Sequence, residues 1–220
     1  MSKVIIFGTG PFAEIVYFYL THDSPHEVIG FTANESYIKE KKLFDLPVIP
    51  FENIEKEYSP SDVSMFVSVG YKNMNKDREK TCNQVKQKGF KLISYVNSKA
   101  TTWNDLTIGE NCFILENNVI QPFVKIGNNV IIWSGNHIGH HSTIDDHCFI
   151  ASHVVISGFV NVGSHCFFGV NSTVRDSIKI SSECVIGAGS LILEDTKFQG
   201  VYTSSPATLK ESSSDKLTHF

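Results

Sequence analysis

Five histidines lie within the segment NHIGHHSTIDDHCFIASH, residues 136–153 of this 220-residue chain. Imidazoles gathered this closely could bind a metal ion or act as general bases. Zinc uses three or four ligands that converge on one point. His147 and His165 have a spacing that would let them pair, but no third ligand is evident, so we expect no metal site. The remaining role for one of these histidines is that of a general base.

A six-residue repeat underlies the histidines. From residue 108 onward every sixth residue is apolar, fifteen times in succession. These residues are Ile108, Ile114, Ile120, Ile126, Ile132, Ile138, Ile144, Ile150, Ile156, Val162, Phe168, Val174, Ile180, Ile186 and Ile192. No helix has this period, and six-residue repeats are typical of a parallel β-helix. The pattern resembles the bacterial hexapeptide-repeat transferases, whose left-handed β-helix winds three hexapeptides into each triangular coil. Residues 106–195 would then form about five coils.

The cysteines support this register. Four of them are separated by multiples of 18 residues, and they are Cys112, Cys148, Cys166 and Cys184. They would form one inward column, with Val130 at the remaining level, so we expect core side chains rather than redox groups. With Cys82 they make an odd number without CxxC spacing, which indicates neither a disulfide framework nor a zinc cluster.

The repeat separates one histidine from the rest. Four others occupy a polar turn position three residues after a repeating apolar residue, and they are His141, His147, His153 and His165. His140 instead lies two residues after Ile138, and the residue one coil further on is Gly158. A residue without a side chain beside a histidine leaves room for a ligand to approach. His140 is therefore the candidate general base.

The first hundred residues follow a different pattern. The stretch VIIFGTGPFAEIVYFYL, residues 4–20, reads as a buried strand, a glycine turn and an amphipathic helix. Its G-x-G-x-x-A turn would direct backbone N–H groups and the positive end of a helix at a phosphate. A strand ending at Gly70, a helix at roughly residues 73–88 and a strand at 91–96 would complete a shortened Rossmann-like α/β unit with a parallel sheet.

A dinucleotide site is not indicated. Such a site usually has an acidic residue at the end of the second strand to hold a ribose. Here that strand, HEVIGFTANES, ends in Thr32, Ala33 and Asn34, with Glu35 only after them. We therefore expect a nucleotide site without NAD, and a purely structural cap domain is the alternative.

The composition disfavours nucleic acids and membranes as binding partners. A formal net charge of −4 and a pI near 6.1 provide no basic field for nucleic acid or anionic lipid. The N-terminus lacks the apolar stretch of a signal peptide, and no apolar run is long enough to span a bilayer, so we expect a cytoplasmic protein without membrane insertion. We expect an α/β domain over residues 1–98, a β-helix over 99–197 and a capping segment and tail over 198–220. The flat sides of a β-helix also favour self-association.

A short α/β domain with G-x-G after its first strand, joined to a hexapeptide-repeat β-helix with His140 in its middle coil, resembles a specific group of enzymes. These are the bacterial nucleotide-sugar N-acetyltransferases and the related sialic acid O-acetyltransferases, and the resemblance covers residues 3–207. It implies a homotrimer with active sites between neighbouring β-helices and acetyl-CoA as co-substrate, without a metal. It also implies that the α/β domain holds the nucleotide sugar, and that the product enters a surface polysaccharide such as O-antigen or a protein glycan.

The resemblance implies roles for individual residues. The catalytic histidine falls on His140, and positions lining acetyl-CoA fall on Gly158, Val170 and Ala188. The positions expected to bind the nucleotide sugar are Gly8, Thr9, Gly10, Pro11, Phe12, Thr32, Gly70 and Tyr71. Trp133 and Asn136, on the turn before His140, are expected as further sugar contacts.

The sequence departs from the family pattern at two places. The family often has a glutamate directly after the catalytic histidine, whereas this chain has His141. Asp145 and Asp146 in the next turn are the other candidates to orient His140. The acidic pair that some members carry after the second strand is replaced by residues 32–34.

The expected mechanism is direct acyl transfer. Neutral His140 would take a proton from the attacking amine of a 4-amino-4,6-dideoxyhexose while its nitrogen adds to the thioester. A backbone N–H near Gly158 would stabilise the oxyanion. Acetylation of a sugar hydroxyl needs the same base and is an alternative, and a non-catalytic trimeric protein that binds nucleotide sugars is another.

Overall fold

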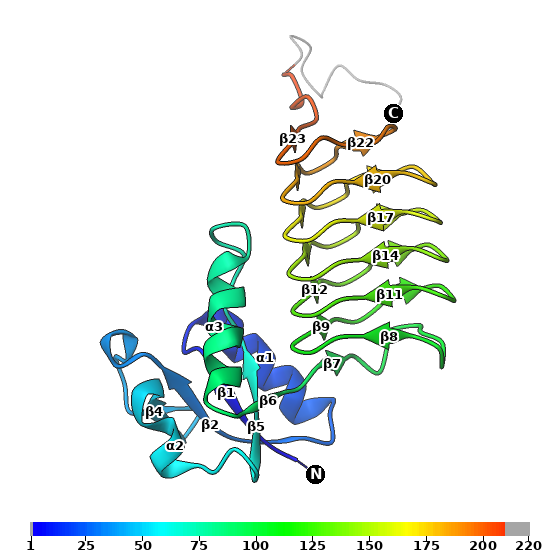
Figure 1. The fold of residues 1–220 in the computed structure, drawn as a ribbon. Coiled ribbons are helices and arrows are strands. Elements are labelled where there is room, and N and C mark those ends of the chain that lie inside the picture. The colour runs from blue at the N-terminus through cyan, green and yellow to red at the C-terminus, as the bar shows by residue number, and fades with distance from the viewer. Residues whose placement is uncertain (1, 210–220) are drawn as a thin grey trace, which may run out of the picture.

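Two differently built domains make up the chain, and the computed structural model describes residues 2–209. Figure 1 shows a sheet flanked by helices in the N-terminal half and a stack of coils rising away from it in the C-terminal half. Of the predicted capping segment and tail at 198–220, residues 210–220 lie outside the described part of the chain.

The N-terminal domain is built on a six-stranded sheet in the order β3-β4-β2-β1-β5-β6. Its strands are β1 (Lys3–Phe7), β2 (Glu27–Ala33), β3 (Lys42–Leu43), β4 (Leu46–Pro50), β5 (Val63–Val67) and β6 (Lys91–Leu92). All neighbouring strands run parallel except β3, which is antiparallel to β4. The apolar runs in β1 (residues 4–7) and β5 (residues 65–67) suit strands that are covered on both faces. The predicted α/β domain with a parallel sheet is confirmed.

Helices cover this sheet. They are α1 (Pro11–His22), α2 (Ile54–Glu57) and α3 (Lys76–Gln87), with 3₁₀ turns η1 (Glu35–Tyr37) and η2 (Phe51–Asn53). Helix α1 begins directly after the glycine turn with Pro11 in its first turn, where a missing N–H costs nothing. Helix α3 is shorter than the predicted residues 73–88 because residues 73–75 all have positive φ, which a right-handed helix does not accommodate.

The C-terminal domain is a triangular prism with three parallel sheets as its faces. The junction face, which meets the N-terminal domain, holds β7 (Tyr95–Val96), β9 (Phe113–Ile114), β12 (Ile131–Ile132), β15 (Phe149–Ile150), β18 (Phe167–Phe168), β21 (Val185–Ile186) and β23 (Val201–Tyr202). The second face holds β10 (Val119–Ile120), β13 (His137–Ile138), β16 (Val155–Ile156), β19 (Thr173–Val174) and β22 (Leu191–Ile192). The third face holds β8 (Thr107–Ile108), β11 (Lys125–Ile126), β14 (Thr143–Ile144), β17 (Asn161–Val162) and β20 (Lys179–Ile180). The predicted left-handed β-helix of about five coils is confirmed.

The corners of the prism explain most of the histidines. Each corner contains a residue with φ near +60°, a conformation in which Asn and His are enriched among residues other than glycine. His141, His147, His153 and His165 all occupy such positions, with φ between 60° and 64°. The histidine-rich segment therefore arises largely from turn positions that recur once per hexapeptide, as predicted.

The prism is filled by the apolar residues of the repeat. Ile138, Ile144, Ile150 and Ile156 are fully buried, as are the cysteine column and Val130. Asparagines extend this interior at one corner, where Asn118 Oδ1 accepts from Asn136 N at 2.9 Å and Asn136 Oδ1 accepts from the backbone of Val154. The prediction that the cysteines belong to the core is confirmed.

The junction between the two domains lies inside a segment that the sequence predicts as one strand. The single strand predicted at residues 91–96 is wrong, because β6 pairs with β5 in the N-terminal sheet and β7 pairs with β9 in the prism. The predicted boundary at residue 98 thus falls after the first prism strand.

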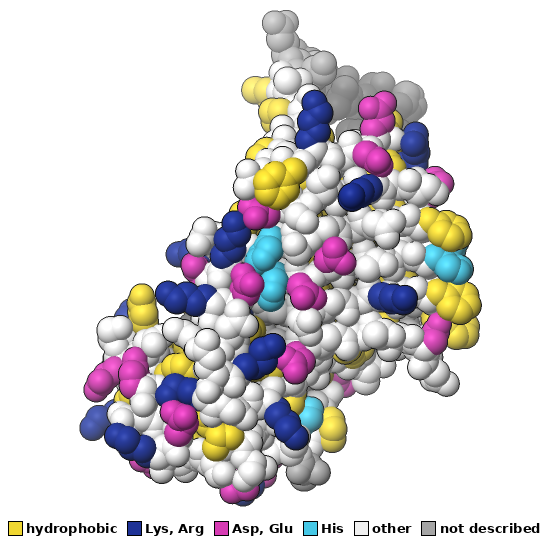
Figure 2. All heavy atoms as spheres, viewed as in Figure 1, with side chains coloured by type: hydrophobic (Ala, Val, Ile, Leu, Met, Phe, Trp, Pro, Cys, Tyr) yellow, Lys and Arg dark blue, Asp and Glu magenta, His cyan; other side chains and the backbone are white. Residues whose placement is uncertain are grey.

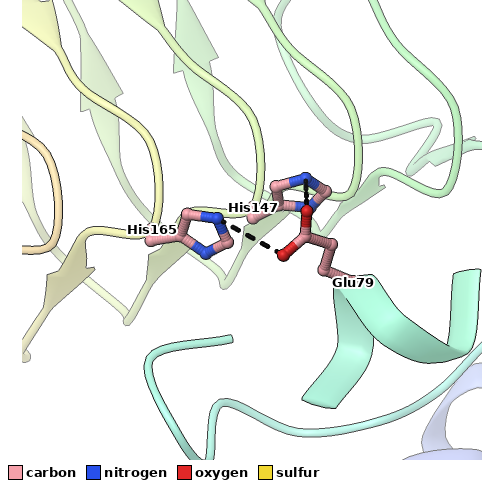
Figure 3. Close-up of side chains that lie close together, drawn as sticks. All are labelled: Glu79, His147 and His165. Atoms are coloured by element: carbon pink, nitrogen blue, oxygen red, sulfur yellow. Dashed lines mark ion pairs between the residues drawn. The ribbon is translucent and has the colours of Figure 1, made fainter. Parts of the chain in front are cut away.

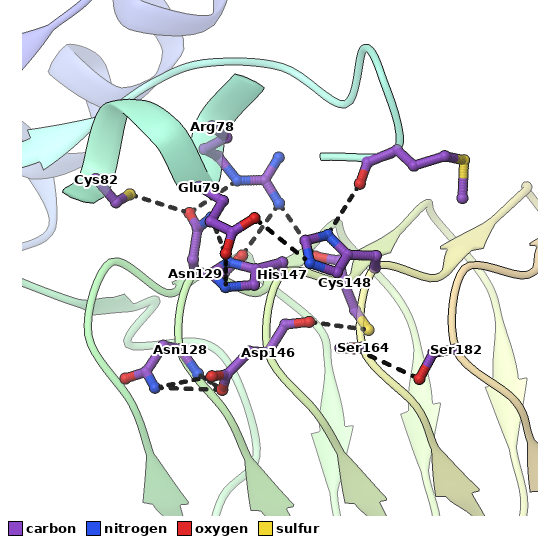
Figure 4. Close-up of polar contacts among 12 residues, drawn as sticks. Arg78, Glu79, Cys82, Asn128, Asn129, Asp146, His147, Cys148, Ser164 and Ser182 are labelled. Atoms are coloured by element: carbon purple, nitrogen blue, oxygen red, sulfur yellow. Dashed lines mark hydrogen bonds and ion pairs between the residues drawn. The ribbon is translucent and has the colours of Figure 1, made fainter. Parts of the chain in front are cut away.

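Arg78 on α3 fastens the domains together (Figure 4). Its fully buried guanidinium donates to Asn129 Oδ1 at 2.8 Å and to the carbonyl of Asn129 at 3.0 Å. Burial lowers the pKa of Arg78 to about 10, so the group stays charged at neutral pH.

Candidate active site

His140 lies at the corner between the second and third faces, here called the His140 corner, which comprises residues 121–124, 139–142, 157–160 and 175–178. The turn after β13 positions it, and its backbone N–H donates to Gln121 Oε1 at 2.9 Å. The side chain is exposed. Its ring packs edge-on against Phe159, with centroids 5.0 Å apart. An exposed imidazole held from behind in this way is free to exchange a proton with a bound molecule.

Gly158 lies directly over this ring, as expected from the 18-residue coil. A Cβ at Gly158 would lie 2.9 Å from Cε1 and 3.0 Å from Nε2 of His140, closer than real side chains approach. Glycine is therefore needed for His140 to keep this orientation. The open space beside Nε2 is where a reacting group can come near.

His141, rather than a carboxylate, contacts the candidate base. The Nδ1 atoms of His140 and His141 are 3.1 Å apart, close enough for one to donate a hydrogen bond to the other. Asp145 and Asp146 lie at the corner between the third and junction faces, and among residues 2–209 no carboxylate hydrogen-bonds to the His140 ring. Asp146 instead accepts from the backbone of Asn128 at 2.6 Å, while burial, then Asp146, raises the pKa of Asp145. The expectation that these two aspartates orient His140 is wrong within one chain, because the strand β14 separates the two corners.

A second group of predicted residues meets elsewhere, around an apolar pocket of about 470 Å³ beside the junction face. The pocket is lined by Tyr71, Trp133, Phe149, Ala151, Ser152, Phe167, Gly169, Val170 and Ala188. Tyr71 packs between Phe149 and Phe167, with ring centroids 4.8 and 5.1 Å away. The structure therefore brings the predicted sugar contacts Tyr71 and Trp133 together with the predicted acetyl-CoA positions Val170 and Ala188.

The glycine turn borders a cleft of about 530 Å³ in the N-terminal domain. Gly8 has φ of +130°, and a Cβ there would lie 2.3 Å from Ser68 Oγ, so only glycine fits. Gly8 and Thr9 line the cleft, and α3 contributes Asp77 and Lys80 from the opposite side. Those two polar residues were missed by sequence reasoning, although their three-residue spacing places them on one face of the helix.

The remaining predicted residues of the turn surround this region. Gly10 and Pro11 are exposed where α1 begins, and Gly70 is exposed beyond the end of β5. Phe12 points the other way, toward the prism, and packs edge-on against Phe113 with centroids 5.8 Å apart. It links the glycine turn to Trp133, whose ring centroid is 6.3 Å away.

Two predicted ligand contacts are wrong. Thr32 is fully buried, and its hydroxyl donates to the carbonyl of Ile49 at 2.7 Å. Asn136 is only 1% exposed; inside the prism its backbone N–H donates to Asn118 Oδ1 and its side-chain oxygen accepts from the backbone of Val154. Both positions look polar and accessible in sequence, but their polar atoms satisfy backbone groups in the interior.

The third ligand that the sequence lacked for His147 and His165 comes from α3 (Figure 3). Glu79 lies 3.6 Å from Nε2 of each histidine, and the imidazole rings are stacked with centroids 4.8 Å apart. The three donor atoms lie within 4.8 Å of one another. Three donor atoms this close together could bind zinc if each offers a lone pair.

Hydrogen bonding disfavours zinc at this cluster (Figure 4). Asn129 Oδ1 already accepts from Arg78 and from Asn111, so its amide nitrogen donates to His147 Nδ1 at 3.0 Å. Neutral His147 then carries its proton on Nε2, the atom that faces Glu79, and has no lone pair there for a metal. The cluster is therefore a polar contact between the domains.

Nucleophilic catalysis by cysteine finds no support in the geometry. All five cysteines are free and buried. Burial raises the pKa of Cys82 to about 12 and that of Cys112 to about 11. Thiolates are the reactive form, so Cys82 and Cys112 are poor nucleophiles at neutral pH, and burial keeps the other three thiols away from substrates.

Charge on the surface is mixed. On the face shown in Figure 2, Lys and Arg side chains alternate with Asp and Glu over both domains. Helices in the described part of the chain are too short or too polar to cross a bilayer.

Comparison with known proteins identifies the repeat. Residues 105–140 and 127–158 match the family described as bacterial transferase hexapeptide (six repeats), and residues 159–194 match the hexapeptide repeat of succinyl-transferase. The prism therefore carries the six-residue repeat described by these two families, over residues 105–194. The resemblance predicted from the six-residue period is confirmed for this half of the chain.

Solved structures with the same fold extend over both domains. Perosamine N-acetyltransferase from Caulobacter crescentus, a histidine-to-asparagine variant in complex with CoA and GDP-perosamine, matches with a TM-score of 0.80 and 22% identity, covering 96% of this chain and 98% of that one. The acetyltransferase domain of PglB from Neisseria gonorrhoeae FA1090, in complex with acetyl coenzyme A, matches at 0.78 and 20% identity, covering 90% and 94%. WeeI from Acinetobacter baumannii AYE matches at 0.72 and 13% identity, covering 91% and 96%. No curated protein sequence matches the chain.

Proposed function

We propose that this protein transfers the acetyl group of acetyl-CoA to the 4-amino group of a nucleotide-linked 4-amino-4,6-dideoxyhexose. The observation that carries the proposal is an exposed His140 whose Nε2 faces the gap left by Gly158, in a hexapeptide-repeat domain joined to an α/β domain with a glycine turn. The Caulobacter perosamine enzyme, which has the same fold, holds CoA and GDP-perosamine. Acetyl-CoA is thus the expected co-substrate.

His140 acts as the general base. In its neutral form with the proton on Nδ1, that proton is donated to His141 Nδ1 and Nε2 keeps a lone pair. The sugar amine attacks the thioester carbonyl, Nε2 takes the amine proton, and the proton is then available to the departing CoA thiolate. This proton transfer contributes about 10² to 10⁴ in rate. The oxyanion would be stabilised by a backbone N–H near Gly158.

The two halves of the site lie on different sides of one prism. The apolar pocket borders the junction face, whereas the His140 corner joins the other two faces. A molecule held in the pocket of one chain therefore cannot meet His140 of the same chain. A neighbouring copy that presents its His140 corner to the pocket would complete the site, and closed cyclic assemblies make such contacts repeatedly. We infer a homotrimer with one active site at each interface.

Second-face residues support this assembly. Val119, Val155 and Leu191 point outward from the second face and are 40%, 37% and 61% exposed. The corresponding outward residues of the third face include Lys125 and Lys179. These apolar residues, which alternate with His137 and Thr173, lie beside the His140 corner on the face that a neighbouring copy would cover.

The α/β domain would hold the nucleotide. The cleft beside Gly8 and Thr9 lies at the carboxyl ends of the parallel strands, where α/β domains bind ligands. Amide groups at the start of α1 suit a diphosphate. The aromatic pocket then suits the deoxysugar and the pantetheine arm, because Trp133, Tyr71 and Phe149 offer apolar faces.

Acetylation of a sugar hydroxyl would use the same base, and a trimeric binding protein would use only the cleft. The deciding experiment incubates the protein with acetyl-CoA and a panel of dTDP-, UDP- and GDP-linked 4-amino-6-deoxy sugars, followed by mass spectrometry. We expect one acetyl group on one amino sugar, and loss of this product in His140→Ala. Transfer only to hydroxyl acceptors such as sialic acid would refute the N-acetyltransferase proposal, and activity that survives in His140→Ala would refute the base.

A further inference from the structure

The His140 corner breaks a rule that the other two corners of the prism follow. At equivalent turn positions with φ near +60°, those corners place Asn, His, Glu, Gln or Gly. The His140 corner instead places Phe123 and Phe159, with φ of 67° and 58°. A bulky side chain is an outlier in this conformation, and such outliers cluster where function requires them.

Within one chain the two phenylalanines gain little burial in return. Phe123 is 59% exposed and Phe159 is 51% exposed. Each lies one coil from His141, one on either side. Phe159 stacks on the His141 ring with centroids 4.8 Å apart and an interplanar angle of 17°, and Phe123 contacts the opposite side at 4.6 Å. The imidazole of His141 is thus held between two aromatic rings.

We propose that Phe123 and Phe159 are positioning residues that clamp His141 in the orientation in which its Nδ1 accepts the Nδ1 proton of His140. The proposal rests on the proposed function and deepens it, because it assigns how this chain orients its base although no carboxylate of residues 2–209 hydrogen-bonds to that ring. With both faces occupied, the His141 ring cannot turn without losing two ring contacts. His140 is perpendicular to it at 89°, which suits an in-plane hydrogen bond between the two rings.

The test replaces both phenylalanines by Asn, the residue that most often fills the same turn at the other two corners of the prism. Phe123→Asn and Phe159→Asn relieve the backbone strain, so the double variant should unfold at the same or a higher temperature. Its kcat should nevertheless fall about tenfold to a hundredfold, because small misplacement of a catalytic group costs this much. KM values for both substrates should change less than about twofold. Phe123→Tyr with Phe159→Tyr keeps both rings and should keep kcat, and Ser177→Asn, one coil beyond Phe159, is the matched control.

A second readout needs no substrate. Nitrogen-15 NMR of the imidazoles distinguishes Nδ1–H from Nε2–H tautomers. In the wild type we expect His140 with its proton on Nδ1 and His141 with its proton on Nε2, and in the double Asn variant a mixture for His141. Unchanged tautomers and unchanged kcat in that variant would overturn the clamp. It would also be overturned if sedimentation showed that the variant loses kcat because the trimer dissociates. If the wild type acetylates nothing, the proposed function fails, while the tautomers still decide the clamp.

Discussion

Gly158→Ala offers a sharp test of the role assigned to His140. The new Cβ would lie 2.9 Å from Cε1 and 3.0 Å from Nε2 of that ring. Ordinary contact needs at least about 0.5 Å more, so the exposed ring must turn away from its position. A displacement approaching 1 Å of a catalytic group costs about 10² in rate. We expect kcat for acetyl transfer to fall about tenfold to a hundredfold.

Stability should not follow the rate. His140 is exposed and can move into solvent, and Gly158 does not have the positive φ that would make alanine strained. The free energy of unfolding in urea should therefore change by no more than about 1 kcal/mol. Asp176→Ala alters the equivalent position one coil further on and serves as the control. Full kcat in Gly158→Ala, or a loss that matches a fall in stability, would refute the placement of the base.

Further predictions concern the pocket, the domain junction and the thiols. Trp133→Ala should raise KM for the nucleotide sugar more than it lowers kcat, measured by steady-state kinetics, because the indole binds without taking part in proton transfer. Burial lowers the pKa of His147, so the free energy of unfolding should fall as pH drops below about 6.5. In urea unfolding, His147→Asn should make this fall with pH shallower, and His153→Asn is the control. Equimolar Zn²⁺ should leave the thermal midpoint unchanged. The five buried thiols should resist alkylation in the native protein, so treatment with an alkylating reagent should leave the acetyl-transfer activity unchanged.

The repeat made most of the prism predictable from sequence. A period of six specifies both which side chains face inward and where the corners fall, so the cysteine column and the turn histidines could be assigned without coordinates. His140 stood out because it departs from that pattern, and Gly158 followed from the 18-residue coil. Local spacing was enough for these residues because their neighbours are set by the coil itself.

Contacts between the domains were beyond the reach of the sequence. Glu79 meets His147 and His165 only because α3 docks on the corner of the prism, and no spacing encodes that docking. Asn136 and Thr32 were misassigned for the opposite reason, since a polar residue that bonds to buried backbone groups looks the same in sequence as one that faces a ligand. The strained turns of Phe123 and Phe159 likewise became visible only as backbone angles.

Mixing two inactive variants tests most directly whether acetyl transfer uses His140 of one copy and the pocket of its neighbour. His140→Ala removes the base, and Ala188→Trp fills the pocket. Each alone should fail to acetylate the accepted amino sugar in the mass-spectrometric assay. After the two are unfolded together, refolded and reassembled at equal amounts, random assembly pairs an intact base with an intact pocket at about one interface in four. We predict about a quarter of the wild-type rate, and a mixture no more active than its separate components would contradict the shared site.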